Sequence, residues 1–258
     1  MSDGATGWGA VARGSVLLFV LGLVGVVALG FFYAPTLRET PELASLSLPM
    51  LVAIASANSA ILLAVFVTIG AVTAPRVGLR SHLYAWATET DPEWHEFRES
   101  LRIAIFLGAV LFVVVAILDA VFTQFLNSGT GAVSDAESLR ALAESIPMRM
   151  LYGGVTEELL LRWGLMSPLA WGLWRARTRL GSITDRPSNW TMWAAIGITA
   201  VLFGLGHLPA LAATYELTTM LVIRTVLLNA IAGLGLGWLY WRHSLETAMV
   251  AHIMFHVV

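Results

Sequence analysis

The chain has 258 residues, of which 57% are hydrophobic and only 12% are charged, and its net charge is −2. A soluble domain carries about 25% charged residues, so this composition indicates a protein that crosses a membrane several times. All 15 basic residues are Arg and they fall in separate short loops, which argues against a nucleic-acid partner. The absence of cysteine excludes disulfides, a cysteine nucleophile and a thiolate metal site.

Seven apolar segments reach or approach the length of about 20 residues that a membrane-spanning helix needs. They are 15–34, 48–74, 103–126, 146–172, 190–212, 218–241 and 244–258. Only a weak small-residue cleavage pattern follows the first segment, so we expect a retained span and not a signal peptide. Because unpaired backbone groups are excluded from lipid, the predicted fold class is all-α, a polytopic transmembrane helical bundle of about seven spans.

Two further segments have a different character. Residues 78–101 mix large apolar side chains with acids and Arg, which predicts an interfacial helix between spans two and three, broken near Asp91 and Pro92. Residues 134–146 open with a capping-box pattern, Ser134 followed by Glu137, which predicts a short helix leading into the fourth span.

The distribution of Arg predicts the orientation. Loops 75–102 and 173–189 carry four Arg each, and Arg13 and Arg242 fall on the same side if seven helices alternate. Because cytoplasmic loops are enriched in Arg, we expect a cytoplasmic N-terminus and an outer C-terminus. We expect a multi-pass integral membrane protein, in the plasma membrane of a prokaryote.

Two adjacent acids, Glu157 and Glu158, lie within the predicted fourth span together with Arg162. Ionisable groups at membrane depth are costly and usually face a protein interior or a water-filled cavity, where they have a function. Glu158 and Arg162 are spaced i, i+4 with the acid first, the favourable order for an ion pair. Helical geometry turns Glu157 away from that pair, so Glu157 is free to act as a base. A purely structural Glu–Arg pair would explain Glu158 and Arg162 but not Glu157.

Three imidazoles fall on predicted spans five and seven. His252 and His256 are spaced i, i+4 and so project from one face of the last span, a spacing also found in helical zinc-binding pairs. His207 follows Gly204 and Gly206 in a small-residue stretch that permits close helix approach. The predicted depths of His207, His252 and Glu157 differ by less than about 10 Å at 1.5 Å per residue, so the three side chains can share one cavity. Interior histidines bonded to backbone carbonyls are the alternative.

In their order and spacing, these three motifs resemble those of the CPBP intramembrane proteases. The motifs are Glu157-Glu158-x-x-x-Arg162, Phe203-x-x-x-His207 and His252-x-x-x-His256. That family includes type II CAAX prenyl endopeptidases and bacteriocin-processing or ABI proteins. The resemblance covers about residues 145–258, so we divide the chain into an N-terminal part, 1–144, with spans one to three, and a catalytic transmembrane core, 145–258.

The resemblance implies roles for the six residues. Glu157 and His207 would activate water, His252 and His256 would stabilise the oxyanion or bind a metal, and Glu158 and Arg162 would support the site or orient the substrate. The family usually has Asn, or sometimes Asp, at the position of His256. An imidazole there can donate to an oxyanion or ligate a metal. Zinc held by His207, His252, His256 and Glu157 is therefore a possible cofactor, and the metalloprotease and glutamate-protease alternatives both stay open.

The function predicted from the sequence is hydrolysis of a peptide bond in or near a membrane-associated peptide or protein. Signatures of other intramembrane proteases, such as His-Glu-x-x-His, Gly-x-Gly-Asp and Gly-x-Ser-x-Gly, are absent. The alternative is a non-catalytic membrane scaffold or bacteriocin-immunity-type binding protein on the same fold. A proton-coupled carrier is disfavoured because neither an inverted repeat nor paired broken helices are evident. Asp119 and Arg224 are expected to form a structural pair, with each other or with Arg149.

Overall fold

The computed structural model describes residues 7–125, 144–181 and 184–257, and within these ranges helices are joined by turns and short loops without any strand, which confirms the all-α prediction. The helices in chain order are α1 (Trp8–Arg38), α2 (Leu48–Thr73), η1 (Pro75–Val77), α3 (His82–Ala87), α4 (Trp94–Thr123), η2 (Arg149–Glu157), η3 (Leu159–Met166), α6 (Ser167–Arg179), α7 (Asn189–Gly206), α8 (Leu208–Ala212), α9 (Thr219–Arg242) and α10 (Leu245–Val257). The helix predicted at residues 134–146 lies almost entirely outside the described residues.

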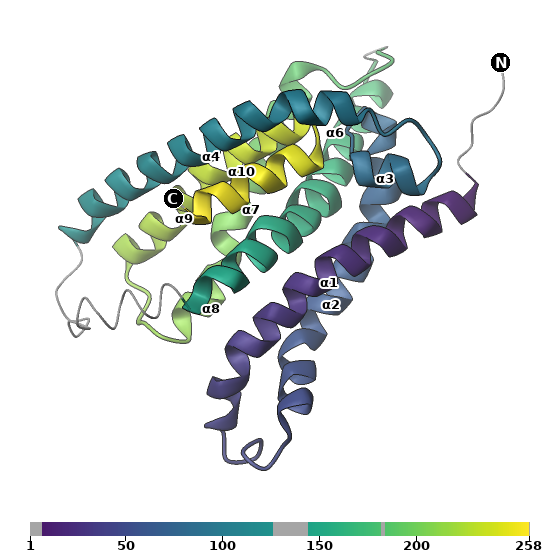
Figure 1. Ribbon diagram of the computed structural model, residues 1–258. Helices are drawn as coiled ribbons and strands as arrows, with labels where there is room; N and C mark the ends of the chain where they lie inside the picture. The colour runs from purple at the N-terminus through teal and green to yellow at the C-terminus, as the bar shows by residue number, and fades with distance from the viewer. Residues whose placement is uncertain (1–6, 126–143, 182–183, 258) are drawn as a thin grey trace.

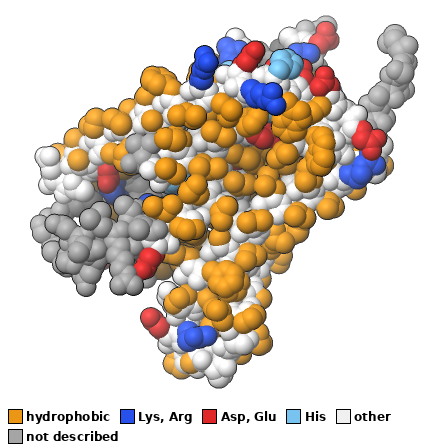
Figure 2. All heavy atoms as spheres, in the orientation of Figure 1, with side chains coloured by type: hydrophobic (Ala, Val, Ile, Leu, Met, Phe, Trp, Pro, Cys, Tyr) orange, Lys and Arg blue, Asp and Glu red, His pale blue; other side chains and the backbone are white. Residues whose placement is uncertain are grey.

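Among the residues that the structure describes, five helices are long and apolar enough to cross a membrane: α1, α2 with η1, α4, α7 with α8, and α9. They correspond to predicted spans one, two, three, five and six. The fourth predicted span falls on a continuous helical run, residues 144–179, and the seventh on the 13-residue helix α10. The total of seven spans therefore stays a prediction. Hydrophobic side chains cover most of the visible face between charged groups at its ends, as expected for a protein surrounded by lipid (Figure 2).

The predicted interfacial helix at 78–101 has a different form in the structure. Its first part contains the short helix α3, and residues 94–101 form the first turns of α4. The break falls at the expected position, because Pro92 has no N–H to donate and Glu93 adopts a left-handed conformation with φ of 46°. Whether α3 lies at the membrane surface stays a prediction.

Residues 144–179, which we call the central rod, contact α1, α2, α7, α9 and α10. In Figure 1, α1 and α2 form a hairpin whose connected end extends away from the other helices, while α4 and α10 run side by side on the other side of the rod. Trp163 of the rod is fully buried and donates its indole N–H to the Val67 carbonyl of α2 at 3.0 Å. The rod is therefore the element on which α1, α2, α7, α9 and α10 converge.

Close backbone approach holds α1 against the rod. Thr156 donates its hydroxyl to the Gly22 carbonyl at 2.7 Å, and a Cβ at Gly25 would collide with the Leu151 carbonyl oxygen and the Thr156 hydroxyl. Small residues at such crossings let membrane helices pack closely and form polar contacts between them. The depth of the rod relative to α1 is thereby fixed by two glycines and one threonine.

The central rod has wide π-helical turns from Arg149 to Met166, apart from Glu158. π-helical turns are rare and occur frequently at functional sites. Glu158 is the junction between η2 and η3, and Glu157 is the last residue of η2. The two predicted acids therefore lie where the helical geometry changes.

Candidate active site

Glu158 lies at the centre of a buried polar cluster. Its carboxylate is within 3.2 Å of Arg162 Nε and accepts a hydrogen bond of 2.8 Å from His252 Nδ1 on α10. Glu158 is 0% exposed, and Arg162 and His252 are each 2% exposed. The predicted pair of Glu158 and Arg162 is confirmed, but the sequence did not predict the hydrogen bond from His252. Because the two residues are 94 positions apart, no local spacing could have revealed it.

Arg162 also links two further helices to the cluster. Its Nη2 atom lies 3.4 Å from the carbonyl oxygen of Gly233 on α9, and its Cζ atom lies 5.3 Å from the centre of the Phe203 ring on α7. A guanidinium over an aromatic face is attracted electrostatically, more so when both are desolvated. The charge of Arg162 is thus balanced by Glu158 and further stabilised by α7 and α9.

Phe203 brings the third imidazole to the cluster. Its ring contacts His207 edge-on, with centroids 4.8 Å apart, and lies 6.2 Å from His252. His207 follows the last residue of α7, one turn after Phe203, and Pro209 in the first turn of α8 restricts continuation of the helix. The sequence places Phe203 in a motif but indicates no role for it. The structure makes it the spacer between two of the predicted site residues.

The hydrogen bonds fix how two of the imidazoles present their nitrogens. His207 Nδ1 lies 2.9 Å from the Phe203 carbonyl oxygen, and His252 Nδ1 faces the Glu158 carboxylate. Carbonyl and carboxylate oxygens accept only, so in each ring Nδ1 carries the proton. Nε2 is then the atom of each ring that remains for chemistry, either as a lone pair in the neutral form or as a second N–H in the cation.

His256 stacks on His252 with ring centroids 4.9 Å apart. A Cβ at Gly153 of η2 would lie 2.7 Å from His256 Nε2 and 3.8 Å from His252 Nε2, so both Nε2 atoms face the bare backbone of that glycine. At the next residue, Gly154, a Cβ would collide with Ile253 of α10. In the sequence the glycine pair is only part of the run around the acids. Its role in the structure is to bring the rod against α10.

Glu157 differs from its neighbour. It is half-buried, and among the described residues it has neither a hydrogen bond nor an ion pair. It directly precedes Glu158, whose carboxylate accepts the hydrogen bond from His252. The structure therefore contains one acid that is engaged on both sides and one that is free, as the helical spacing predicted.

The described residues do not form a ready ligand set for a metal ion. Within the part of the chain that the structure describes, His, Asp and Glu side chains form no group of three or more placed to hold a metal. The four donors predicted for zinc therefore do not converge in this geometry, and we derive no chemical step through a metal. Zinc binding stays a prediction.

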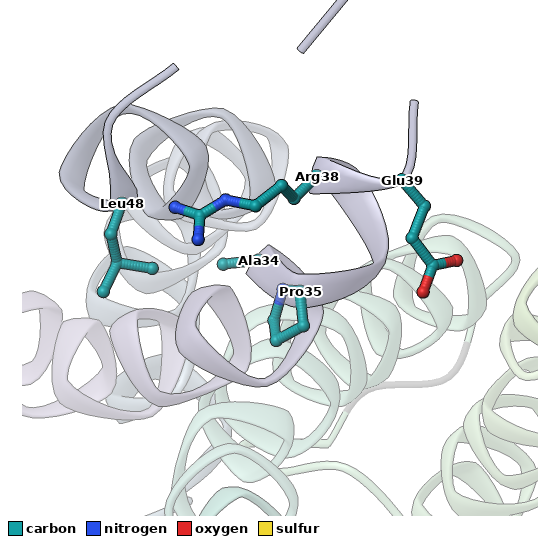
Figure 3. A pocket seen from close by; sticks show the side chains of 5 residues that line it. All are labelled: Ala34, Pro35, Arg38, Glu39 and Leu48. Atoms are coloured by element: carbon teal, nitrogen blue, oxygen red, sulfur yellow. The ribbon is translucent and has the colours of Figure 1, made fainter. Parts of the chain in front are cut away.

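Other predicted groups lie apart from the cluster. Asp119 and Arg224 form the expected pair between α4 and α9, with Arg224 Nε donating at 2.6 Å. A hollow shown in Figure 3 lies at the α1–α2 connection, lined by Ala34, Pro35, Arg38, Glu39 and Leu48. It includes no member of the Glu–His–Arg cluster, so nothing connects it with the candidate chemistry.

Comparison with known proteins finds a family similarity over the C-terminal part of the chain. Residues 140–258 match the family model described as type II CAAX prenyl endopeptidase Rce1-like. The resemblance carried by the three motifs is thereby confirmed at the level of this family. No curated protein and no solved structure matches the chain.

The two acids are predicted to differ in their effect on stability. Replacing Glu158 with Ala leaves Arg162 buried without its partner, and breaking a buried pair costs about 3–5 kcal/mol. Replacing Glu157 with Ala removes no hydrogen bond or ion pair, so we expect a loss below about 1 kcal/mol. Denaturant unfolding of both variants in detergent micelles measures the difference. Equal losses of unfolding free energy would contradict the division between the two acids.

Proposed function

We propose that the protein is an intramembrane endopeptidase that hydrolyses a peptide bond in or near a membrane-associated peptide or protein. The observation that carries this proposal is the carboxylate of Glu157, which makes neither a hydrogen bond nor an ion pair among the described residues and directly precedes the acid to which His252 is bonded. The match of residues 140–258 to a protease family supports the same reaction class.

In the proposed reaction Glu157 accepts a proton from a water molecule. His207 Nε2 accepts a hydrogen bond from the same water and helps to orient it. The resulting hydroxide attacks the carbonyl carbon of the substrate peptide, and a tetrahedral oxyanion forms. When the C–N bond breaks, the proton held by Glu157 passes to the leaving amine, so the carboxylate is regenerated.

The oxyanion is stabilised by His252 and His256. For His252 this role requires a proton on Nε2 in addition to the one on Nδ1, which means the imidazolium form. Glu158 Oε1 accepts the Nδ1 hydrogen bond of that imidazolium, and Arg162 in turn holds Glu158 in place. Hydrogen-bond donors that are already in position when charge develops are among the largest contributions to enzyme catalysis. Glu158 and Arg162 are thus positioning residues rather than reacting groups.

Replacement of Glu157 by Gln tests the proposal across all membrane proteins of the cell, so no single substrate has to be chosen. We expect the termini of some membrane proteins to be present in cells with the parent protein and absent with Glu157→Gln, because the amide cannot accept the proton from water. Quantitative proteomics of membrane-protein termini makes the comparison. Glu89→Gln, at an 80% exposed side chain, is the matched control for loss of one charge. Identical termini in the parent and Glu157→Gln cells would overturn the proposal.

Metal chelation tests the metal-free form of the reaction. We expect 1,10-phenanthroline to leave the formation of Glu157-dependent termini in isolated membranes unchanged, since no ligand set is assembled within the described residues. The rate at which these termini form is measured in the same membranes with and without the chelator. Loss of these products on chelation, with recovery on added zinc, would show that the donors converge on a metal after all.

We also propose that the N-terminus is cytoplasmic and the C-terminus outside, in the plasma membrane of a prokaryote, as the Arg distribution predicts. The chain has no cysteine, so single cysteines report topology without background. In intact cells a membrane-impermeant maleimide should label Thr40→Cys, between α1 and α2, and should not label Asp185→Cys, between α6 and α7. The reverse pattern would refute this orientation.

A further inference from the structure

The first turn of α10 is anchored unusually firmly for the end of a membrane helix. Ser244, Leu245 and Thr247 are 0% exposed and Glu246 is 6% exposed. Glu246 is an ionisable side chain that neither the sequence motifs nor the proposed reaction uses. Buried ionisable groups at membrane-protein sites are expected to have partners that explain their cost.

Glu246 accepts three hydrogen bonds from the segment that begins α3. Its Oε1 atom accepts from the Ser81 hydroxyl at 2.6 Å and from the Leu83 backbone N–H at 3.0 Å. Its Oε2 atom accepts from the His82 backbone N–H at 3.0 Å. The carboxylate therefore caps the N-terminus of α3 from a residue 163 to 165 positions away in the chain.

The donors at this contact require a group that only accepts. The Ser81 oxygen already accepts from the Tyr84 N–H at 3.1 Å, so its own hydrogen is directed to Glu246. Backbone N–H groups can only donate. A glutamine at position 246 would present an NH2 group to at least one of these donors and leave it without a partner. The contact is specific for a carboxylate.

Neighbouring groups strengthen the same anchor. The Leu245 N–H donates to the Arg80 carbonyl oxygen at 3.0 Å, and the Thr247 hydroxyl lies 2.7 Å from the Ser100 hydroxyl of α4. The guanidinium of Arg80 is engaged elsewhere, by Glu93 and Glu96. One turn of α10 is thus attached to both α3 and α4, and Glu246 makes the largest number of these hydrogen bonds.

We propose that Glu246 is a positioning residue of the active site, because it sets the depth and rotation of the helix that carries His252 and His256. This inference rests on the proposed hydrolytic function. Along an α-helix the two histidines lie about 9 Å and 15 Å beyond Glu246. Glu246 at one end and the His252–Glu158 hydrogen bond in the middle attach α10 at two points. Loss of the first leaves the stacked imidazoles free to shift relative to Gly153 and Glu157.

Three variants separate this role from a general loss of charge. Glu246→Gln removes the acceptor-only group and keeps its size, whereas Glu246→Asp keeps the carboxylate and shortens its reach. Ser81→Ala removes one of the three donors and is the milder change if Glu246→Gln folds poorly. Glu89→Gln is the matched control, because Glu89 is an exposed acid that follows α3 and pairs with Arg13 at 3.3 Å.

The geometry is measured without reference to activity. In the cysteine-free chain, spin labels at Val257→Cys on α10 and Ile61→Cys on α2 occupy side chains that are 52% and 65% exposed. We expect one narrow distance distribution in the parent and in Glu89→Gln. We expect a shifted or broadened distribution in Glu246→Gln, with partial recovery in Glu246→Asp and a smaller change in Ser81→Ala.

Activity is measured as the rate at which Glu157-dependent termini form in isolated membranes. We expect Glu246→Gln to lower this rate about 10- to 100-fold, since displacement of a catalytic group by about 1 Å can cost 100-fold. Adding Ser81→Ala to Glu246→Gln should cause no further loss, because both residues act through one contact.

An unchanged distance distribution in Glu246→Gln would overturn the proposal, and so would a changed distribution with a parental rate. A rate that falls while the distances stay the same would also overturn it, because Glu246 would then act by another route. Failure of the proposed function has a separate signature. If Glu157→Gln abolishes no termini, hydrolysis is excluded, whereas the spin-label distances still decide whether Glu246 positions α10.

Discussion

The structure depends on one buried carboxylate, Glu158, that is shared between a guanidinium and an imidazole. A charge with 0% exposure inside an apolar protein is tolerated only when it is paired and hydrogen-bonded. Arg162 supplies the pairing from one turn along the rod, and His252 supplies a hydrogen bond from α10. Arg162 then reaches α9 through the Gly233 carbonyl and α7 through the Phe203 ring. Four elements of the fold therefore meet at a single ionic group.

The hydrogen bond between His252 and Glu158 contributes both to the packing of the fold and to the arrangement of the candidate site. The hydrogen bond that Glu158 Oε1 accepts also fixes which nitrogen of His252 faces away from it, and the contact between Phe203 and His207 places a second imidazole nearby. The neighbouring acid, Glu157, is left without such engagement. A site of this kind gives two consecutive acids different surroundings. Glu157 makes neither a hydrogen bond nor an ion pair among the described residues, whereas Glu158 is held by Arg162 and His252.

The sequence predicted much of the fold because hydrophobic length is a strong signal in membrane helices. The predicted boundaries of spans two and six fall within one residue of α2 and α9 at each end. The Glu158–Arg162 pair was predictable because its spacing is local. The start of α4 at Trp94 was missed, since a charged amphipathic turn looks the same in sequence whether it lies on the membrane surface or begins a spanning helix. The π-helical turns of the rod correspond to no sequence pattern that was recognised.

Contacts between residues far apart in the chain could not be predicted from the sequence. The hydrogen bonds from His252 to Glu158 and from Ser81 to Glu246 join residues 94 and 165 positions apart. Motif spacing places such residues on helix faces but does not say which faces meet. Glu246 in particular lay outside every motif, although a lone acid in the first turn of an apolar helix is a signal that could have been followed.

The protonation of His252 provides the most direct test of this account. Solid-state NMR of protein labelled with ¹⁵N-histidine, assigned through His252→Gln, resolves the two imidazole nitrogens of that residue. The account predicts a protonated Nδ1 whose signal moves when Glu158 is replaced by Gln, because Glu158 is the group that accepts its hydrogen bond. An unprotonated Nδ1 with the single proton on Nε2, and a ¹⁵N signal that Glu158→Gln leaves unchanged, would contradict the central role of Glu158.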